Sequence, residues 1–457
     1  MKIPAILEKI AKKLQNIDAK PIIVGGAVRD YLLNKEIKDY DIEVFNIDSL
    51  EELQNILSEF GSVNIVGKSF GVVKLKVDNL EFDFSLPRVE KKINKGHKGF
   101  SVKLKPNISF KQAALRRDCT INAMGWDIVE KKLLDPFGGK KDLFTKTLQI
   151  VDKNSFIEDP LRVYRAVQFA ARFNLKLSPQ TKEAILKIKK SGELESLPKE
   201  RIFSEFNKFL LKAKKPSIAL ELLKELNLLD YFLELKQIIN VPQNPIYHSE
   251  GDVWTHTLMV VDNMAKLKPK NEKKALILLY SALTHDFGKA VTTKIIDGKI
   301  TAYGHEIAGV KLSETFLKRL TNNQELIDEV KKLVRYHLAI PQFFRNGAKI
   351  GAIRRLATKV NIKDLELLAR ADFFGRGGNE NKTFEAGDWI LQKAKELNCL
   401  NSAPKPLLGG KDLIALGLTP SKKFGDILKK AYKAQLDNKF KTKNEAINWL
   451  KKNLNNF

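Results

Sequence analysis

The stretch PIIVGGAVRDYLLNKEIKDYDIEVF, residues 21–45, decides how the N-terminal part of the chain folds. An apolar run leads into the pair Gly25–Gly26, then a short amphipathic segment, then a second run that carries Asp39 and Asp41. Glycines directly after a strand let the backbone approach a ligand closely, and the helix that follows turns its free N–H groups toward it. We therefore predict a strand, a phosphate-binding turn, a helix and a second strand.

The second strand carries alternating acidic residues. Asp39, Asp41 and Glu43 share one face, and the apolar residues between them share the other, because side chains alternate along a strand. Carboxylates held this close repel unless a cation lies between them, and Mg²⁺ accepts carboxylates together with substrate phosphates. An edge strand with a solvated acidic face would show the same residues. The glycine turn upstream, with Arg29 one turn on, favours the Mg²⁺ site.

Residues 62–88 alternate as three further strands, and the last places Asp83 between two phenylalanines that we expect to face the core. Asp83 either completes a carboxylate trio as the base that accepts the proton of an attacking hydroxyl, or is a solvent-facing strand residue. Residues 89–101 are basic and contain glycine, so they predict a mobile loop near a phosphate-rich site. The segment 133–143, which contains DPFGG, predicts a hinge-like turn.

Two arginine-rich segments follow. Residues 114–127 contain Arg116, Arg117, Asp118 and Asn122, which could bind a triphosphate and sugar hydroxyls or form a surface ion-pair cluster.

Residues 157–173 predict a helix with Asp159 as its cap and Pro160 in its first turn, and with Arg162 and Arg165 on one face. An acid and an arginine one turn apart offer an acceptor and donors to the pairing edge of a nucleobase. A simple helix cap beside a solvated basic stripe is the alternative. Residues 174–245 show helical periodicity with frequent lysine.

The composition narrows the class of partner. The chain has 457 residues, enough for about three domains, with 80 Lys and Arg against 54 Asp and Glu and a net charge of +26. This imbalance argues against a neutral metabolic enzyme and favours RNA, DNA or an acidic membrane surface, although a lysine-rich bias contributes. Two cysteines, no secretory signal and no long apolar run predict a soluble, cytoplasmic protein.

Histidines are concentrated in the second half of the chain. Five of the six lie between His248 and His337. Adjacent His285 and Asp286 on an apolar helix, with His256 upstream and Asp372 downstream, bring imidazole and carboxylate ligands together for a divalent metal. A single histidine on such a helix is usually a packed core residue, but four or five in this order favour a metal site.

Six motifs in order resemble those of the class II tRNA nucleotidyltransferase and bacterial poly(A) polymerase family: GGAVRD, DYD, RRDCTINA, DPFGG with KDL, EDPLRVYRA and ERIFSEF. The resemblance covers about the first half of the chain and implies an α+β head, a polymerase β-like nucleotidyltransferase with a mixed sheet, followed by an all-α neck and body. It also implies roles for single residues. The catalytic acids would be Asp39, Asp41 and Asp83, the first two holding Mg²⁺; the nucleotide would be held by Gly25, Gly26, Arg29 and Arg117; and the base edge of CTP or ATP would be read by Asp159 and Arg162, with Arg165 beside them. Asp83 stands where many members have Glu.

The histidine pattern resembles the HD phosphohydrolase superfamily, an all-α fold. The resemblance implies that His256, His285, Asp286 and Asp372 hold a divalent metal such as Mg²⁺, Mn²⁺ or Ni²⁺. His305 and His337 match positions that support a second metal or bind phosphate. In one bacterial branch of the nucleotidyltransferase family an HD domain follows the head and is associated with phosphodiesterase and phosphatase activity on small phosphoesters.

Together these resemblances imply an enzyme that adds C, C and A to the 3′ end of tRNA from CTP and ATP, with no membrane and no obligate protein partner. The expected domains are a head at 1–146, a neck and body at 147–245, an HD domain at 246–395 and a Lys-rich helical tail at 396–457. A poly(A) polymerase, an enzyme that adds only CC or only A, and a non-catalytic RNA-binding or nucleotide-sensing protein are the alternatives.

Overall fold

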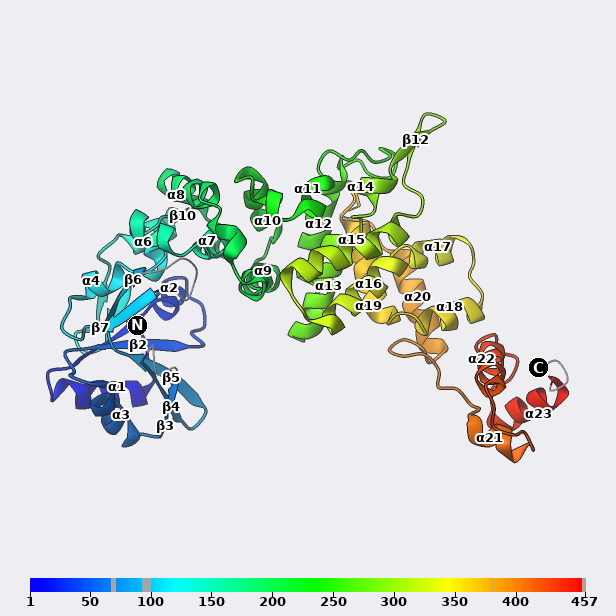
Figure 1. Cartoon of the computed structure of the whole chain (residues 1–457), viewed down its shortest axis with the longest axis horizontal. Coiled ribbons are helices and arrows are strands. Elements are labelled where there is room, and N and C mark those ends of the chain that lie inside the picture. The colour runs from blue at the N-terminus through cyan, green and yellow to red at the C-terminus, as the bar shows by residue number, and fades with distance from the viewer. Residues whose placement is uncertain (67–70, 93–99, 380, 454–457) are drawn as a thin grey trace. The chain divides into compact units, whose positions relative to one another are not determined.

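The computed structural model describes residues 1–66, 71–92, 100–379 and 381–453 (Figure 1). Within it the chain forms two compact units. The first comprises Met1–Ala213 and Ile218–Tyr231, and the second comprises Lys214–Ser217 and the residues from Phe232 onward. The finer division into four domains stays a prediction.

A seven-stranded mixed sheet in the order β3-β4-β5-β2-β1-β8-β9 is the centre of the first unit. Among the described strands of this sheet, β2 and β5 pair in parallel, and all other neighbouring strands pair antiparallel. The strands are β1 (Lys20–Val24), β2 (Tyr40–Phe45), β3 (Ser62–Val66), β4 (Val72–Val77), β5 (Leu80–Ser85), β8 (Gly125–Asp127) and β9 (Lys132–Leu134).

The apolar residues of residues 21–45 form the middle of this sheet, as the alternation predicts. Ile23 in β1 and Ile42 and Val44 in β2 are fully buried. Phe82 and Phe84, which flank Asp83 in β5, are buried as expected. The helices that accompany the sheet are α1 (Ala5–Gln15), α2 (Gly26–Leu32), α3 (Leu50–Ser58), α4 (Phe110–Ala114) and α5 (Gly139–Phe144), with the 3-10 turn η1 (Thr120–Asn122).

One expectation for a loop needs correction. The flanks of the predicted loop at 89–101 pair as the antiparallel strands β6 (Arg88–Lys92) and β7 (Phe100–Leu104), and residues 93–99 lie outside the described residues. The turn expected at 133–143 is present, and within it the Asp135 carboxylate accepts hydrogen bonds from the backbone N–H groups of Gly139 and Lys140 at the start of α5. Its role as a hinge stays a prediction.

The remainder of the first unit is mainly helical, as predicted for residues 174–245. Its elements are α6 (Lys153–Glu158), α7 (Arg162–Phe173), α8 (Pro179–Lys190), η2 (Glu193–Ser196), α9 (Lys199–Lys212), α10 (Ser217–Glu225) and η3 (Leu228–Tyr231), with the short parallel pair β10 (Thr147–Leu148) and β11 (Lys176–Leu177). The helix predicted within residues 157–173, with Asp159 as its cap and Pro160 in its first turn, begins later than expected, because α7 starts at Arg162. Pro160 lies between α6 and α7, where the chain turns at Asp159, whose side chain accepts a hydrogen bond from Leu161 N at 3.1 Å.

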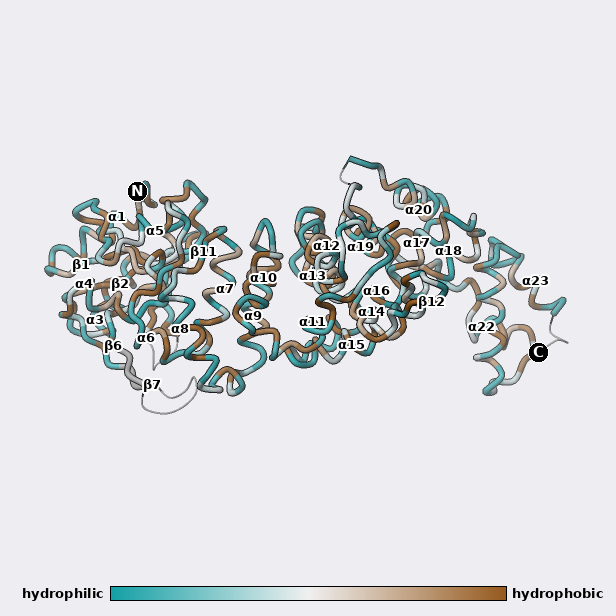
Figure 2. Tube along the Cα trace, turned by 90° about the horizontal axis from the view of Figure 1, so that it is seen from above, coloured by the Kyte–Doolittle hydropathy of each residue, from teal (hydrophilic) through white to brown (hydrophobic). Residues whose placement is uncertain are grey.

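Among its described residues the second unit is helical apart from one exposed hairpin, in agreement with the expected HD fold. Helices α12, α13, α16 and α19 pack against one another, and apolar and polar residues alternate along them (Figure 2). The elements are α11 (Leu233–Gln237), α12 (Val253–Leu267), α13 (Glu272–Thr284), α14 (Lys289–Thr292), β12 (Lys294–Ile296), β13 (Lys299–Thr301), α15 (His305–Leu320), α16 (Gln324–Tyr336), α17 (Ala339–Arg345), α18 (Ile350–Ala357), α19 (Ile362–Phe374) and α20 (Glu385–Glu396).

The C-terminal helices α21 (Gly410–Ala415), α22 (Lys423–Leu436) and α23 (Lys443–Asn453) enclose a small apolar core that includes Leu413, Ile427 and Leu450. Arg355 of α18 forms an ion pair with Asp437, so this tail contacts the rest of its unit. Among the described residues, none of the helices is long and apolar enough to cross a membrane.

Candidate functional site

The acidic residues of the first unit meet at the parallel strand pair. Asp41 of β2 lies in register with Asp83 of β5, so the two carboxylates stand side by side on neighbouring strands. Asp39 precedes β2 by one residue. The sequence prediction that Asp83 joins the Asp39–Asp41 pair therefore agrees with the strand register.

The charges around Asp41 suit a divalent cation. Its pKa is raised, first by loss of hydration and then by repulsion from Asp83, Asp39 and Glu43, while Arg117 acts in the opposite direction. The negative charge of Asp83 is partly compensated by Lys74 of β4, because Lys74 Nζ lies 3.1 Å from Asp83 Oδ1. Carboxylates that repel in this way gain when a cation is shared between them, so the residues present fit Mg²⁺.

The Gly25–Gly26 turn lies against the RRD segment. Gly25 has φ +70°, which favours glycine, and a Cβ there would stand 3.1 Å from Arg117 Nη1. Arg117 Nη1 also donates to the backbone oxygen of Asn122 at 3.3 Å. Two predicted nucleotide-binding elements, the turn and Arg117, are thus in contact.

Glu43 differs from its expected place in an open row of carboxylates. It is only 1 % exposed, because Arg116 and Arg117 both donate to its Oε1. Two guanidinium groups neutralise it, and it is removed from the surface that Asp41 reaches. Its ion pairs hold the side chains of the two arginines together.

Arg29, predicted from the sequence to bind the nucleotide, is buried and contacts two other side chains. It is 5 % exposed, donates to Asn122 Oδ1, and stacks on the ring of Phe173 with its guanidinium carbon 4.3 Å from the ring centroid. Asn122, which the sequence placed near the arginines, therefore joins α2 to the RRD segment.

The start of α7 lies beside the same segment. Arg162 donates to the backbone oxygen of Arg116 at 2.6 Å and to that of Ser155 at 2.8 Å. Arg165 Nε donates to Asp118 Oδ2 at 2.7 Å, and although burial opposes ionisation of Asp118, Arg165 and the bond from Asn122 hold its pKa well below the usual range. The segments predicted to read the base and to bind the phosphates are therefore neighbours within one unit.

In the second unit the predicted metal ligands form one buried cluster. His256 Nε2 lies 3.0 Å from Asp372 Oδ1, and His285 Nε2 lies 3.3 Å from Asp286 Oδ2. All four side chains are nearly or fully buried. The sequence prediction named these four residues, and the structure brings them together.

The ring tautomers in this cluster suit metal binding. Nδ1 of His285 donates to the backbone oxygen of Ala282 at 2.9 Å, so its lone pair lies on Nε2. The Nε2 atoms of His256 and His285 are buried and have no hydrogen-bond partner. Buried nitrogens without a partner beside two carboxylates are what a bound divalent metal would complete.

A second group faces the other oxygen of Asp286. His305 Nε2 lies 3.3 Å from Asp286 Oδ1, and His337 Nε2 lies 3.8 Å from it. Nδ1 of each ring donates to a backbone oxygen, and the two Nε2 atoms are hydrogen-bonded to each other at 3.2 Å. Burial and the neighbouring His305 and His285 lower the pKa of His337 to about 3. Asp286, His305 and His337 are buried and each offers one ligand atom, so these residues also fit a second metal.

A pocket of about 670 Å³ opens beside the cluster. Lys289 and Arg376 line it, and each pairs with a carboxylate of the cluster: Lys289 Nζ lies 2.7 Å from Asp286 Oδ2, and an Arg376 nitrogen lies 2.9 Å from Asp372 Oδ2. Cations beside a cluster that could hold a metal favour an anionic ligand such as a phosphate ester.

Comparison with known proteins identifies the family of this chain. A "Multifunctional CCA protein" of Mannheimia succiniciproducens is 34 % identical over 381 residues, covering 81 % of this chain and 87 % of that protein. One of Neisseria meningitidis is 35 % identical over 321 residues, covering 70 % and 73 %. The chain belongs to the multifunctional CCA protein family. Within it, residues 22–149 match the poly A polymerase head domain, 174–238 the "probable RNA and SrmB- binding site of polymerase A", and 253–373 the HD domain.

Solved structures of CCA-adding enzymes share the fold of this chain. The CCA-adding enzyme of Bacillus stearothermophilus in complex with CTP has a TM-score of 0.68 and 21 % identity, and covers 100 % of this chain and 99 % of its own. The Thermotoga maritima CCA-adding enzyme complexed with tRNA has a TM-score of 0.60 and 19 % identity, covering 99 % and 96 %.

Several residues that contact the two candidate sites of this chain were not predicted from the sequence. Lys289 lies three residues after Asp286 and Arg376 four after Asp372, so helical spacing could have pointed to both. Glu43 gave no such signal, because its burial depends on the packing of a segment far along the chain.

Gly288, next to the His285–Asp286 pair, sets how closely α14 approaches α15. A Cβ at this position would lie 2.0 Å from the backbone oxygen of His305 and 2.7 Å from Gly309 N. We expect Gly288→Ala to destabilise the second unit by about 1–3 kcal/mol, measured by urea unfolding. Gly425→Ala is the control: its Cβ meets open space within α22, so it should stabilise by up to about 1 kcal/mol. Equal stability of the two variants would contradict the close approach.

Proposed function

We propose that the first unit adds C, C and A to the 3′ end of tRNA from CTP and ATP without a nucleic-acid template. The observation that carries the proposal is the register of Asp41 with Asp83 on the sheet whose Gly25 turn contacts Arg117. Relatives more than 30 % identical are named multifunctional CCA proteins, which supports the substrate.

In the proposed reaction the tRNA 3′ oxygen attacks the α-phosphorus of the nucleotide, a new phosphodiester bond forms, and the bond to the β-phosphate oxygen breaks to release pyrophosphate. Asp39 and Asp41 would hold Mg²⁺, which supplies charge neutralisation at the phosphates. Asp83 would accept the hydroxyl proton. Gly25, Gly26, Arg29 and Arg117 would hold the triphosphate.

The deciding experiment uses tRNA transcripts that end before CCA, after C and after CC. Each is incubated with CTP, ATP or both, and the products are resolved to one nucleotide. Products from all three transcripts that stop at CCA support the proposal. Unlimited addition of A would identify a poly(A) polymerase, the alternative that the poly A polymerase head match keeps open. Addition of only CC or only A would identify a partial enzyme.

We also propose that Asp159 and Arg162 select the nucleotide by bonding the pairing edge of its base, with Arg165 beside them. If so, Asp159→Ala should raise misincorporation of U or G relative to C and A by about tenfold, a typical value for losing one base contact.

Asp152→Ala is the matched control for Asp159→Ala. Asp152 caps α6 by accepting a hydrogen bond from Ser155 N at 2.7 Å, so its loss should lower stability and leave nucleotide choice unchanged. If both variants choose nucleotides alike, Asp159 has only a structural role and does not select the base. The readout is single-nucleotide extension with each of the four triphosphates.

A second activity is proposed for the HD domain: metal-dependent hydrolysis of small phosphoesters. The buried Nε2 atoms of His256 and His285 without partners, beside a cation-lined pocket, favour it. His256, His285, Asp286 and Asp372 would hold Mg²⁺, Mn²⁺ or Ni²⁺. Incubation with 2′,3′-cyclic nucleotide and each metal tests the activity, and failure to release product with every metal would refute it for this substrate.

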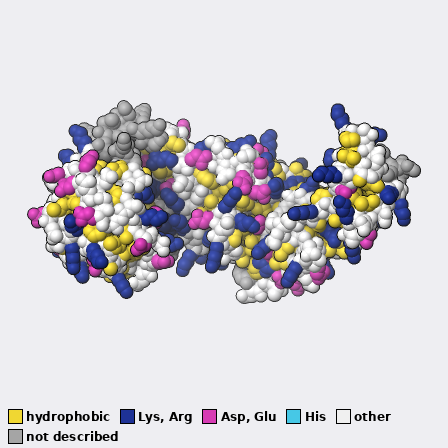
Figure 3. Space-filling view, turned by 90° about the horizontal axis from the view of Figure 1, so that it is seen from below, with side chains coloured by type: hydrophobic (Ala, Val, Ile, Leu, Met, Phe, Trp, Pro, Cys, Tyr) yellow, Lys and Arg dark blue, Asp and Glu magenta, His cyan; other side chains and the backbone are white. Residues whose placement is uncertain are grey.

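Binding of tRNA through backbone and shape is proposed for the basic surface. Lys and Arg side chains are spread along the face shown in Figure 3, and residues 404–453 contain twelve lysines against four acidic residues. This composition supports the tail at 396–457 as a separate RNA-contacting domain after the head, the body and the HD domain. A cytoplasmic location is proposed from the free, buried Cys119 and Cys399.

A further inference from the structure

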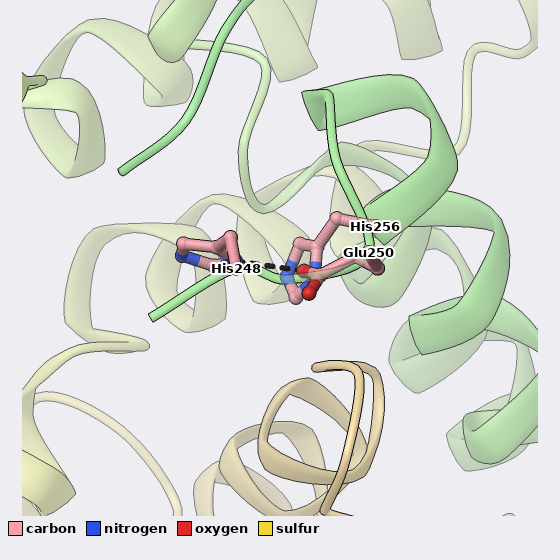
Figure 4. Close-up of side chains that lie close together, drawn as sticks. All are labelled: His248, Glu250 and His256. Atoms are coloured by element: carbon pink, nitrogen blue, oxygen red, sulfur yellow. Dashed lines mark hydrogen bonds and ion pairs between the residues drawn. The ribbon is translucent and has the colours of Figure 1, made fainter. Parts of the chain in front are cut away.

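A carboxylate outside the predicted ligand set connects a metal ligand to the wall of the pocket. Glu250 Oε1 lies 2.8 Å from Nδ1 of His256 and 2.8 Å from Nδ1 of His248 (Figure 4). The Glu250 side chain is 2 % exposed, and its Oε2 accepts a hydrogen bond from Gly377 N at 3.0 Å. One buried carboxylate therefore holds two imidazoles and a backbone N–H.

These three side chains lie close enough together to raise the question of a further metal site. The hydrogen bonds argue against one. Both Nδ1 atoms stand at hydrogen-bond distance from the same oxygen, and the other oxygen is already bonded to Gly377 N. A metal here would also take Nδ1 of His256, whose N–H otherwise satisfies Glu250. The group is satisfied as a hydrogen-bonded bridge.

The bridge determines which nitrogen of each ring is free. With Nδ1–H donated to Glu250, the lone pair of His256 lies on Nε2, 3.0 Å from Asp372 in the metal cluster. Nδ1 of His256 also donates a hydrogen bond to the backbone oxygen of Gly375 at 3.3 Å, so Glu250 shares this N–H with a backbone carbonyl. In His248 the nitrogen left over is likewise Nε2, and His248 lines the pocket.

The backbone around this bridge is closely packed. A Cβ on Gly377 would lie 2.5 Å from Ser249 Oγ and 3.1 Å from Glu250 N, so the segment after α19 lies close to the segment before α12. Arg376 beside it pairs with Asp372. The bridge therefore joins the two helices that supply His256 and Asp372.

We propose that Glu250 is a positioning residue for the HD metal centre: it fixes His256 with Nε2 toward the metal and sets His248 with Nε2 as an acceptor for a hydroxyl group of the bound ligand. This inference rests on the proposed phosphohydrolase function for its ligand, but the metal-binding half does not need that activity. His248 complements the cations Lys289 and Arg376, because a phosphate ester of a sugar carries both an anion and hydroxyl groups.

The test is isothermal titration of Mn²⁺ into the full-length protein and its variants. Glu250→Gln keeps the shape and an acceptor for Gly377 N, but its neutral amide cannot accept both imidazole N–H groups well, so we expect affinity for Mn²⁺ to fall about 10–100-fold. His248→Asn is the matched control. It removes the other partner of Glu250 and leaves the bond to His256, so it should bind Mn²⁺ like the wild type and raise the KM for 2′,3′-cyclic nucleotide.

The outcomes separate the two proposals. Wild-type Mn²⁺ affinity in Glu250→Gln overturns the positioning role, whether or not the protein hydrolyses phosphoesters. Reduced Mn²⁺ affinity in a protein without phosphoester hydrolysis would support the positioning role and refute the proposed activity. Absence of Mn²⁺ binding to the HD cluster in the wild type overturns the positioning role, and the assays with Mg²⁺, Mn²⁺ and Ni²⁺ decide the proposed hydrolysis separately.

A measurement on the wild type keeps the inference testable if Glu250→Gln does not fold. Long-range ¹H–¹⁵N correlation spectra of ¹⁵N-histidine-labelled protein, recorded with Mg²⁺, report the tautomer of each ring. We expect Nδ1–H at both His248 and His256. Nε2–H at His256 would overturn the proposal.

Discussion

Replacing Asp41 with asparagine is expected to lower the rate of both C and A addition by about 10³-fold or more. Asp41 lies in register with Asp83, and both Asp83 and Asp39 raise its pKa by repulsion after loss of hydration. A neutral amide of the same shape removes one of the charges that would hold Mg²⁺ against the phosphates. Single-turnover extension of a tRNA transcript ending in CC, with ATP, measures the effect.

The control for Asp41→Asn lies on the neighbouring strand. Glu81 of β5 is exposed, lies two residues before Asp83 and pairs in register with Lys76 of β4. It is not one of the proposed Mg²⁺ ligands, so Glu81→Gln should keep wild-type extension. Mn²⁺ binding by the HD domain should be unchanged in both variants, because its ligands belong to the other compact unit. Full extension by Asp41→Asn would revive the interpretation as a non-catalytic nucleotide-binding protein.

The local parts of the first site could be predicted from sequence. Alternation placed Asp39, Asp41 and Glu43 on one face, and the glycine pair indicated a close backbone approach, which Gly25 shows with its positive φ. The register of Asp41 with Asp83 could not be derived, since strands distant in sequence can pair in many ways. The strand pattern therefore left two possibilities open for Asp83, a third carboxylate beside Asp39 and Asp41 or a solvent-facing residue.

Burial accounts for most of what sequence reasoning missed. Glu43 has the same local pattern as Asp41, yet two arginines from a distant segment cover it. In the HD domain the order of histidines predicted the ligands, but the hydrogen bonds that fix their tautomers come mostly from backbone oxygens and from Glu250, which no ligand pattern includes. The supporting contacts become visible only when helices far apart in sequence are packed together.

Asp286→Asn is expected to have the largest effect in the second unit. Its Oδ2 faces His285 and its Oδ1 faces His305, so one carboxylate serves both groups of ligands. We expect affinity for Mn²⁺ to fall at least about 100-fold and metal-dependent phosphoester hydrolysis to be lost, since an amide is a poor metal ligand and bridges two sites less well.

Stability gives a readout of Asp286→Asn that does not depend on activity. A ligand at 100 times its dissociation constant stabilises the folded state by about 2.7 kcal/mol, so Mn²⁺ should raise the unfolding temperature of the wild type and not that of Asp286→Asn. The variant also leaves Lys289 without its carboxylate, so the metal-induced shift must be compared within each protein. Asp328→Asn, on the exposed face of α16, should keep the wild-type shift. A full shift in Asp286→Asn would show that Mn²⁺ binds elsewhere, because no other carboxylate among the described residues contacts both His285 and His305.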